Sequence, residues 1–295
     1  MLHQRLRAAT NRGADDRRGA LNHLTQARVL AALGEVRVGR TVSLAAPMET
    51  WVSPDNPEPY VHEMKGSKRA SAPGLRFALD RIATNIHGNA HSHIDALSHV
   101  IYDNTLYNEV PADTETATGA ATLSIDIDHD GIVGRGVLLD IPRSRGVQWL
   151  EPGDHVTAED LVEAEQAQRV VVGEGDLLFV RVGHRARRIA RGPWNAAEHR
   201  AGLHPSALEF LADRRVAMLG GDGNNDTAPS TTEGVDFPVH TLAVHAMGLQ
   251  LLDYLQFEEL LPICEEQGRW SFLAVVAPLR IPGATGSPVN PIAVL

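Results

Sequence analysis

A histidine-rich segment, residues 86–100 with the sequence IHGNAHSHIDALSHV, carries the side chains best suited to chemistry. Four of the chain's 14 histidines and one aspartate fall within it. If residues 89–95 form an extended strand, His91, His93 and Asp95 share one face, because alternate side chains of a strand point the same way. His87 joins them if the strand begins early or bulges. Four histidines and an aspartate at alternating spacing argue against the alternative of separate polar residues on a surface loop. Imidazole and carboxylate donors favour Zn²⁺ or Mn²⁺. We therefore predict a divalent-metal site with coordination positions open for catalysis.

The stretch from His93 to His99, HIDALSH, resembles the metal-dependent cyclase family, which includes bacterial kynurenine formamidase and isatin hydrolase. The family pattern is H-x-G-T-H-x-D-x-P-x-H. Its second histidine, aspartate and last histidine correspond to His93, Asp95 and His99. Ser92 stands in place of its threonine, and Leu97 replaces its proline. The resemblance implies that His93 and Asp95 bind the metal.

The sequence departs from this pattern at the first metal ligand. Counted without gaps, the first histidine of the pattern falls on Asn89, whose neutral amide is a weaker ligand than imidazole for these metals. Two histidines can replace it: His87 after a two-residue bulge, or His91 along the same face. We expect His87 to be the third ligand, because His87-Gly88 looks like the first histidine of the pattern and its glycine displaced by an insertion.

Further segments extend the resemblance to about residues 40–295. They are Gly175–Gly183, the turn 221–226, Pro238–His240, Leu251–Asp253 and the carboxyl-terminal tail. The resemblance implies a swivelling β/β/α fold, a homodimer or homotetramer, and hydrolysis of an amide or lactone in a cyclic or aromatic small molecule. A polyketide-type cyclase acting at the same metal site is the enzymatic alternative. A non-catalytic metal-binding protein is the alternative outside enzymes.

Two more histidines receive catalytic roles in this hypothesis. His99, with an ordinary pKa near 6.5, is the predicted general base or proton shuttle for a water activated by the ion. His240 is expected to stabilise the oxyanion or to help hold the metal, and Asp253 to orient a histidine.

Other residues are predicted to line or support the site. The turn GGDGNND at 220–226 lacks the glycine that a calcium loop needs at its sixth position, Thr227. We therefore expect Asp222 or Asp226 to orient neighbouring groups instead. Trp51 is a candidate wall for a ring substrate.

Apolar periodicity and turn residues predict the elements that position these side chains. Strands are expected at 136–142, 176–182, 216–219 and 272–277, helices at 21–34, 205–214 and 257–266, a capped helix from Thr157, and an apolar helix or strand at 240–252. Residues 66–74 and the Gly- and Pro-rich tail 283–295 are expected to be irregular. The predicted fold class is α/β with α+β character, in one domain over 1–295 whose residues 1–39 form an N-terminal helical extension.

Charge and composition exclude several classes of function. The net charge of -10 argues against a nucleic-acid partner, because phosphate binding requires a basic surface. No apolar run of about 18 residues is present for a membrane span. The single cysteine, Cys264, fits a reducing compartment, and we expect a cytoplasmic location.

Overall fold

A mixed sheet forms the centre of the computed structural model, which describes residues 1–10, 12–69 and 74–295. Within these ranges the sheet has nine strands in the order β1-β15-β13-β7-β9-β11-β12-β4-β14. Their bounds are β1 (Thr41–Ser43), β15 (Ile292–Val294), β13 (Ser271–Val276), β7 (Ile132–Asp140), β9 (Leu177–Arg181), β11 (Met218–Gly221), β12 (Gln250–Asp253), β4 (His93–Asp95) and β14 (Gly286–Pro288). The predicted mixed α/β fold is confirmed.

The four central strands β7, β9, β11 and β12 run parallel, and both sides of this group continue with antiparallel strands. Every residue of β9, β11 and β12 is buried. Strands covered on both faces have apolar side chains on both faces, which explains the continuous apolar runs in the sequence. The predicted strands at 136–142, 176–182 and 216–219 correspond to β7, β9 and β11.

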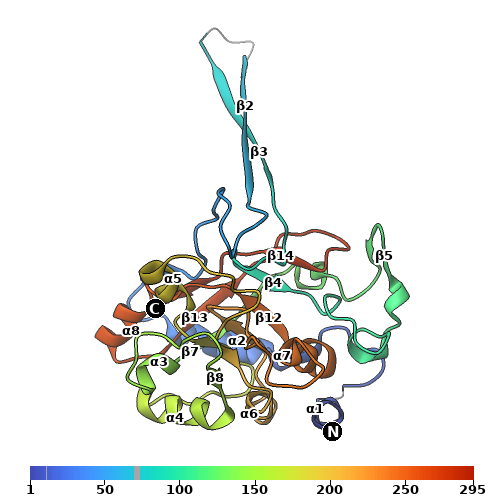
Figure 1. The fold of residues 1–295 in the computed structure, drawn as a ribbon, viewed down its shortest axis with the longest axis vertical. Helices are drawn as coiled ribbons and strands as arrows, with labels where there is room; N and C mark the ends of the chain where they lie inside the picture. The colour runs from blue at the N-terminus through green and yellow to red at the C-terminus, as the bar shows by residue number, and fades with distance from the viewer. Residues whose placement is uncertain (11, 70–73) are drawn as a thin grey trace.

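Helices pack around this sheet (Figure 1). They are α1 (Leu2–Ala9), α2 (Gln26–Ala32), α3 (Ile141–Ser144), α4 (Ala158–Gln168), α5 (His184–Arg191), α6 (Ala207–Arg214), α7 (Pro238–His240) and α8 (Leu261–Gln267), with short helical turns η1 (Gly19–His23), η2 (Leu33–Glu35), η3 (Tyr107–Glu109), η4 (Ala112–Thr114) and η5 (Ile125–Asp128). The predicted cap of α4 is present: the Thr157 hydroxyl accepts from the backbone N–H of Asp160, whose carboxylate accepts from the N–H of Thr157. The described residues of the N-terminal segment form α1, η1, α2 and η2, and Leu6 and Leu21 are buried against the body.

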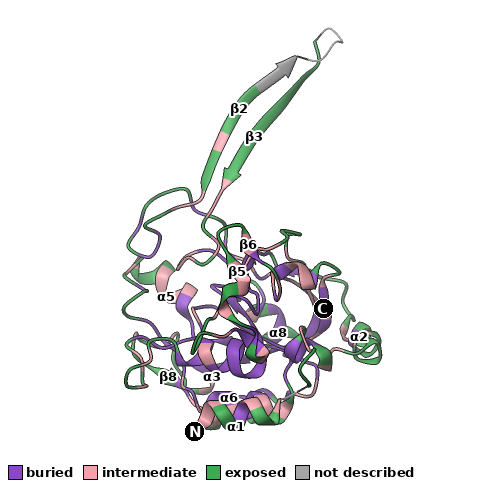
Figure 2. Cartoon of the chain, turned by 90° about the vertical axis from the view of Figure 1, so that its right-hand side faces the viewer, coloured by how far each residue is buried: buried purple, intermediate pink, exposed green. Residues whose placement is uncertain are grey.

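A two-stranded arm projects from the body. It consists of β2 (Val61–Arg69) and β3 (Arg76–Ala83), paired antiparallel (Figure 1). Figure 2 shows that the arm is exposed almost throughout, whereas the interior of the body is buried. Its exposed side chains include the apolar Met64, Phe77 and Ile82. The smaller strand pairs are β5 (Glu115–Thr116) with β6 (Gly119–Ala120), and β8 (His155–Val156) with β10 (Gly202–Leu203).

The structure corrects three predictions about elements. Residues 66–69 belong to strand β2 and not to a loop, while 70–73 lie outside the described residues. The tail forms β14 and β15; Pro288 is tolerated because β14 is an edge strand, where a missing backbone donor leaves no neighbour unpaired. Residues 240–252 divide between a π-helical segment, η6 (Thr241–Met247), and β12.

None of the helices in the described part of the chain combines the length and the apolar character needed to cross a lipid bilayer.

Candidate metal centre

Strand β4 carries the first half of the centre. It lies between β12 and β14 and pairs antiparallel with both, so that His93 is the register partner of Asp253 on one side and of Pro288 on the other. His93 and Asp95 therefore share one face of the strand, while Ile94 points into the core and is fully buried. The expected strand over 89–95 is wrong in its extent, because only 93–95 pair.

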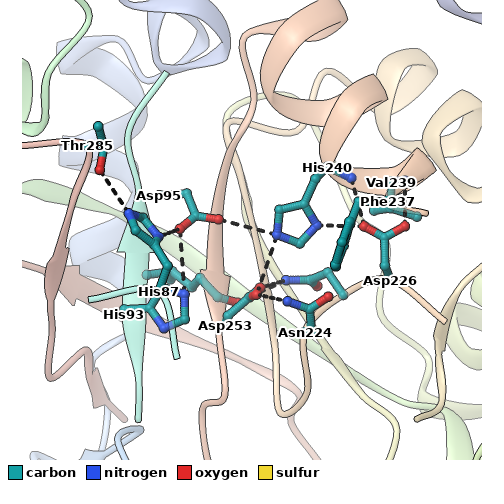
Figure 3. Close-up of polar contacts among 12 residues, drawn as sticks. His87, His93, Asp95, Asn224, Asp226, Phe237, Val239, His240, Asp253 and Thr285 are labelled. Atoms are coloured by element: carbon teal, nitrogen blue, oxygen red, sulfur yellow. Dashed lines mark hydrogen bonds and ion pairs between the residues drawn. The ribbon is translucent and has the colours of Figure 1, made fainter. Parts of the chain in front are cut away.

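Two carboxylates and two imidazoles converge at this point of the sheet (Figure 3). His93 Nε2 lies 3.6 Å from Asp95 Oδ1. His240 Nε2 lies 3.4 Å from Asp95 Oδ2 and 3.5 Å from Asp253 Oδ2. One potential ligand atom from each of His93, Asp95 and Asp253 lies within 4.8 Å of the others. The short distances, together with the mixture of nitrogen and oxygen donors, suit one divalent ion such as Zn²⁺ or Mn²⁺.

Asp95 shows that this set fits a cation. Its side chain is buried, and Oδ2 accepts no hydrogen bond from the described residues, although His240 Nε2 lies 3.4 Å away. Burial alone would raise its pKa, but the surrounding histidines, His99 and His240 foremost, hold the pKa of Asp95 well below its usual range. A buried carboxylate oxygen that is ionised and lacks a donor is costly unless a positive charge meets it. A divalent ion held by these side chains would satisfy that oxygen.

His240 is oriented by Asp226. Asp226 Oδ2 lies 2.6 Å from His240 Nδ1 and accepts the backbone N–H of His240 at 3.0 Å, while Oδ1 accepts that of Val239 at 2.7 Å. The second ring nitrogen, Nε2, is thereby directed at the carboxylates (Figure 3). Burial lowers the pKa of His240, but Asp226, Asp253 and Asp95 outweigh it and raise the pKa well above the ordinary value. Asp226, one of the two residues expected to orient a neighbour, occupies that position.

Asp253 is fixed by the same turn. Its Oδ2 accepts from Asn224 Nδ2 at 2.8 Å, and its Oδ1 accepts from Asn225 Nδ2 at 2.6 Å. Both asparagines follow β11, which pairs with β12 in parallel, so the turn and Asp253 lie at the same edge of the sheet. Asp253 was predicted to orient a histidine; it lies in the candidate ligand set itself.

His87 and His99 form a second group around Asp95. His87 Nδ1 lies 2.8 Å from Asp95 Oδ1, and Nε2 lies 3.0 Å from Thr285 Oγ1. The His87 ring stacks on that of His99, with 3.7 Å between centroids. His87, Asp95 and His99 also place ligand atoms within 4.8 Å of one another. The predicted triad of His87, His93 and Asp95 is thus divided between two groups that share Asp95.

His91 and Asn89, the other candidates for the third ligand, have different surroundings. His91 is buried, and its Nε2 accepts the backbone N–H of Glu49 at 3.1 Å. Asn89 lines the site, where its Oδ1 accepts the hydroxyl of Tyr254 at 2.9 Å. The structure therefore brings His87 to Asp95 and turns His91 away.

Two predicted supporting residues lie outside the cavity of the site. Asp222 accepts the backbone N–H groups of Val182 and Gly183, at 2.7 and 2.8 Å, and so joins two strand ends. Trp51 is 58% exposed and does not line the cavity. Its loop is held against α5, because Arg188 binds both Glu49 and Asp55.

A cavity of about 650 Å³ opens over these side chains. Its lining includes the histidines and carboxylates above and an apolar part, Val100, Ile101, Tyr102, Val235 and Phe237. Asn224, from the turn 220–226 that was expected to line the site, belongs to it, as do Arg200 and Phe237, which no sequence pattern indicated. Arg200 is isolated in the sequence, and only the fold brings it to the cavity.

The chain was compared with known families and structures. The family model described as "Putative cyclase" matches residues 39–225. A solved structure described as a novel cyclase is 32% identical, with a TM-score of 0.87 and 99% of each chain covered. A comparison with curated proteins gave no match.

More distant solved structures share the fold. Isatin hydrolase A from Ralstonia solanacearum is 23% identical, with a TM-score of 0.61, over 91% of this chain and 97% of that one. An isatin hydrolase bound to the product analogue thioisatinate is 20% identical, with a TM-score of 0.58, over 91% of this chain and 95% of that one. The family match and the cyclase structure of 32% identity show that this chain belongs to the cyclase family.

Proposed function

We propose that this protein is a metal-dependent hydrolase that cleaves an amide or lactone bond in a cyclic or aromatic small molecule. The observation that carries the proposal is the convergence of His93, Asp95 and Asp253 in the lining of a cavity, where Asp95 Oδ2 accepts no hydrogen bond from the described residues. The relatives described as isatin hydrolases support the bond type, since isatin is a cyclic amide.

His93, Asp95 and Asp253 would hold the ion, with His240 beside them. When bound, a divalent ion supplies Lewis acidity toward the substrate carbonyl and lowers the pKa of a water molecule. Asp226 keeps Nε2 of His240 directed at this position by binding Nδ1. Such an outer carboxylate fixes both the tautomer and the ring orientation of a histidine at a metal.

His99 is the proposed proton acceptor. Its ring lines the cavity and has no hydrogen bond to any described residue, so a nitrogen remains available. Burial, the largest influence, lowers the pKa of His99 to about 4, so the ring is neutral near pH 7 and can accept a proton. The apolar side chains of Val100, Ile101 and Phe237 provide a surface for a ring and exclude water from it.

The test combines metal exchange with a substrate screen. Chelator-treated protein, and the same protein reloaded with Zn²⁺ or Mn²⁺, are assayed against aryl formamides, isatin-like lactams and lactones. We expect turnover of at least one class after reloading and none without metal. Full activity in protein that elemental analysis shows to be metal-free would refute the proposal.

We also propose that the protein self-associates through its arm. Met64 and Phe77 are 63% and 54% exposed on a two-stranded hairpin, a unit that has marginal stability alone in water. A groove of about 690 Å³ at the base of the arm, lined by Met48, Ile82 and Leu279, offers an apolar surface to a second copy. Light scattering should give a dimer or tetramer that Met64→Ser with Phe77→Ser dissociates. Val171→Ser, an exposed apolar position outside the arm and the groove, is the control. A monomeric wild-type protein would disprove the assembly.

A further inference from the structure

Arg200 places a positive charge in the wall of the catalytic cavity. Its side chain is among the largest fully buried ones in the described chain, with 1% of the residue exposed. The residue nevertheless lines the cavity together with His93, Asp95 and Asp253. A buried cation at this position needs an explanation, because desolvating an unpaired charge is costly.

The hydrogen bonds of Arg200 use only part of the guanidinium. Nε donates to the carbonyl of Asp226 at 2.9 Å, and Nη1 donates to those of Ala196 and Ala197 at 2.9 and 2.7 Å. All three acceptors are neutral backbone oxygens. Nη2 has no acceptor, and no carboxylate forms an ion pair with Arg200, among the residues that the structure describes.

The other buried arginine among the described residues is neutralised, because Arg181 lies 2.9 Å from Asp140. The half-buried Arg188 likewise binds the carboxylates of Glu49 and Asp55. Holding the backbone in place would require only Nε and Nη1 of Arg200. The absence of a carboxylate and the unused Nη2 therefore distinguish Arg200 as a group whose counter-ion comes from outside the chain.

We infer that Arg200 binds a carboxylate carried by the substrate, which makes the substrate a cyclic or aromatic acid. This inference rests on the proposed hydrolase function and specifies its substrate class. An arginine side chain suits a carboxylate because its planar donors match the two oxygens.

Phe237 relates this subsite to the reacting end of the cavity. Cζ of Arg200 lies over the Phe237 ring, 5.3 Å from its centroid, and the ring centroids of Phe237 and His240 are 5.8 Å apart. A flat substrate lying across Phe237 can therefore place its carboxylate at Arg200 and its scissile carbonyl near His240 and the metal ligands. The apolar neighbours Val100 and Ile101 complete a surface for the ring between these two ends.

The first experiment measures binding without turnover, so its outcome is independent of the proposed function. Benzoate and benzamide are titrated into metal-free wild-type protein by calorimetry, since without the ion benzoate cannot bind through a metal. We expect benzoate to bind at least tenfold more tightly and Arg200→Gln to remove this preference. A charge-assisted hydrogen bond contributes on the order of 10- to 100-fold in affinity. Arg280→Gln is the control, because it removes the same charge from a side chain that is 69% exposed and outside the cavity.

The second experiment uses reloaded protein and a matched pair of substrates, 2-formamidobenzoate and formanilide, which differ only in the ring carboxylate. Arg200→Gln should raise KM for the first about 10- to 100-fold and leave KM for the second within about threefold. Arg200→Lys, which keeps the charge, should have an intermediate effect. Thermal unfolding identifies a variant that fails to fold. In that case the preference of the wild-type protein for benzoate over benzamide decides whether the inference holds.

Three results would overturn the inference. Equal binding of both probes by the wild-type protein would contradict a carboxylate site. Equal weakening of both substrates in Arg200→Gln would indicate a structural role only. Equal KM values for the pair, with product inhibition relieved in Arg200→Gln, would assign Arg200 to a product carboxylate instead. If the reloaded protein hydrolyses no formamide, lactam or lactone but benzoate still requires Arg200, the hydrolase proposal fails and the carboxylate site stands.

Discussion

The two halves of the metal centre are positioned by different forces. His93 and Asp95 lie in β4, whose backbone is paired on both edges, so the ladder itself sets their place. His240 lies outside the sheet, and its ring is directed by one carboxylate, Asp226. The first half is therefore insensitive to small side-chain changes nearby, whereas the second depends on individual hydrogen bonds.

The largest effect is expected at Asp95, which belongs to both ligand groups. Asp95→Asn should lose the metal and reduce turnover to background, more than the roughly 10- to 100-fold loss typical of an outer partner. Mass spectrometry measures the metal that the variant binds, and an activity assay measures its turnover. Asp236→Asn, at an exposed residue of the same cavity, is the control. Equal losses in both variants would contradict the assignment of Asp95.

Asp226→Asn tests the second half. The amide cannot accept both backbone donors and the His240 ring as the carboxylate does, so metal affinity or turnover should fall about 10- to 100-fold. Asp222→Asn is a matched control, since Asp222 is also buried and also accepts two backbone N–H groups, but outside the cavity. If Asp222→Asn lowers metal affinity equally, the effect belongs to the turn and not to His240.

His87→Ala and His91→Ala separate the two candidate third ligands. His87 contacts Asp95 directly, while His91 binds the backbone of Glu49. We expect His87→Ala to lower metal affinity about tenfold or more, and His91→Ala to change it little. Metal titration of both variants decides between the two histidines. If His87→Ala binds the metal as tightly as wild type, the third ligand is another residue.

The smallest effect concerns Asp128, a buried carboxylate that does not line the cavity of the site. Burial, partly offset by the hydrogen bond from Gln250, raises its pKa to about 6. A raised carboxyl pKa favours folding while the group is protonated, so this stability is lost as the pH rises through 6. Asp128→Asn should therefore gain about 1 kcal/mol relative to wild type between pH 5 and 8, roughly 2 °C in Tm. Asp130→Asn, at a side chain that is 93% exposed, should show no such trend in the same melting curves.

The sequence predicted the fold well where a strand is buried on both faces. The apolar runs at 136–142, 176–182 and 216–219 became β7, β9 and β11, because such a run has few alternatives in a mixed α/β fold. It failed at β14 and β15, where Gly and Pro suggest irregular structure. Pairing with neighbours far away in the chain overrides that local preference.

For the site, the sequence identified the residues that lie close together in the chain. His93, Asp95 and His99 share one short motif, and their spacing carries chemical meaning. The turn 220–226 indicated Asp222 or Asp226 as an orienting residue, and only the structure shows that Asp226 is the one beside His240. The role of Arg200 depends on the packing of a loop, for which no local pattern exists. His91 was placed on the metal face because the strand was expected to begin earlier than residue 93.

The position of β4 between β12 and β14 also has a consequence for the order of events during synthesis. The backbone of His93 acquires its partners on both edges only when residues 250–253 and 286–288 have been made. At about 5–20 residues per second, the ribosome takes roughly 10 to 40 s to reach them after His93. During that interval the histidine segment has no sheet to hold it. We therefore expect metal loading to follow completion of the chain, and an early ion to meet only loosely held histidines.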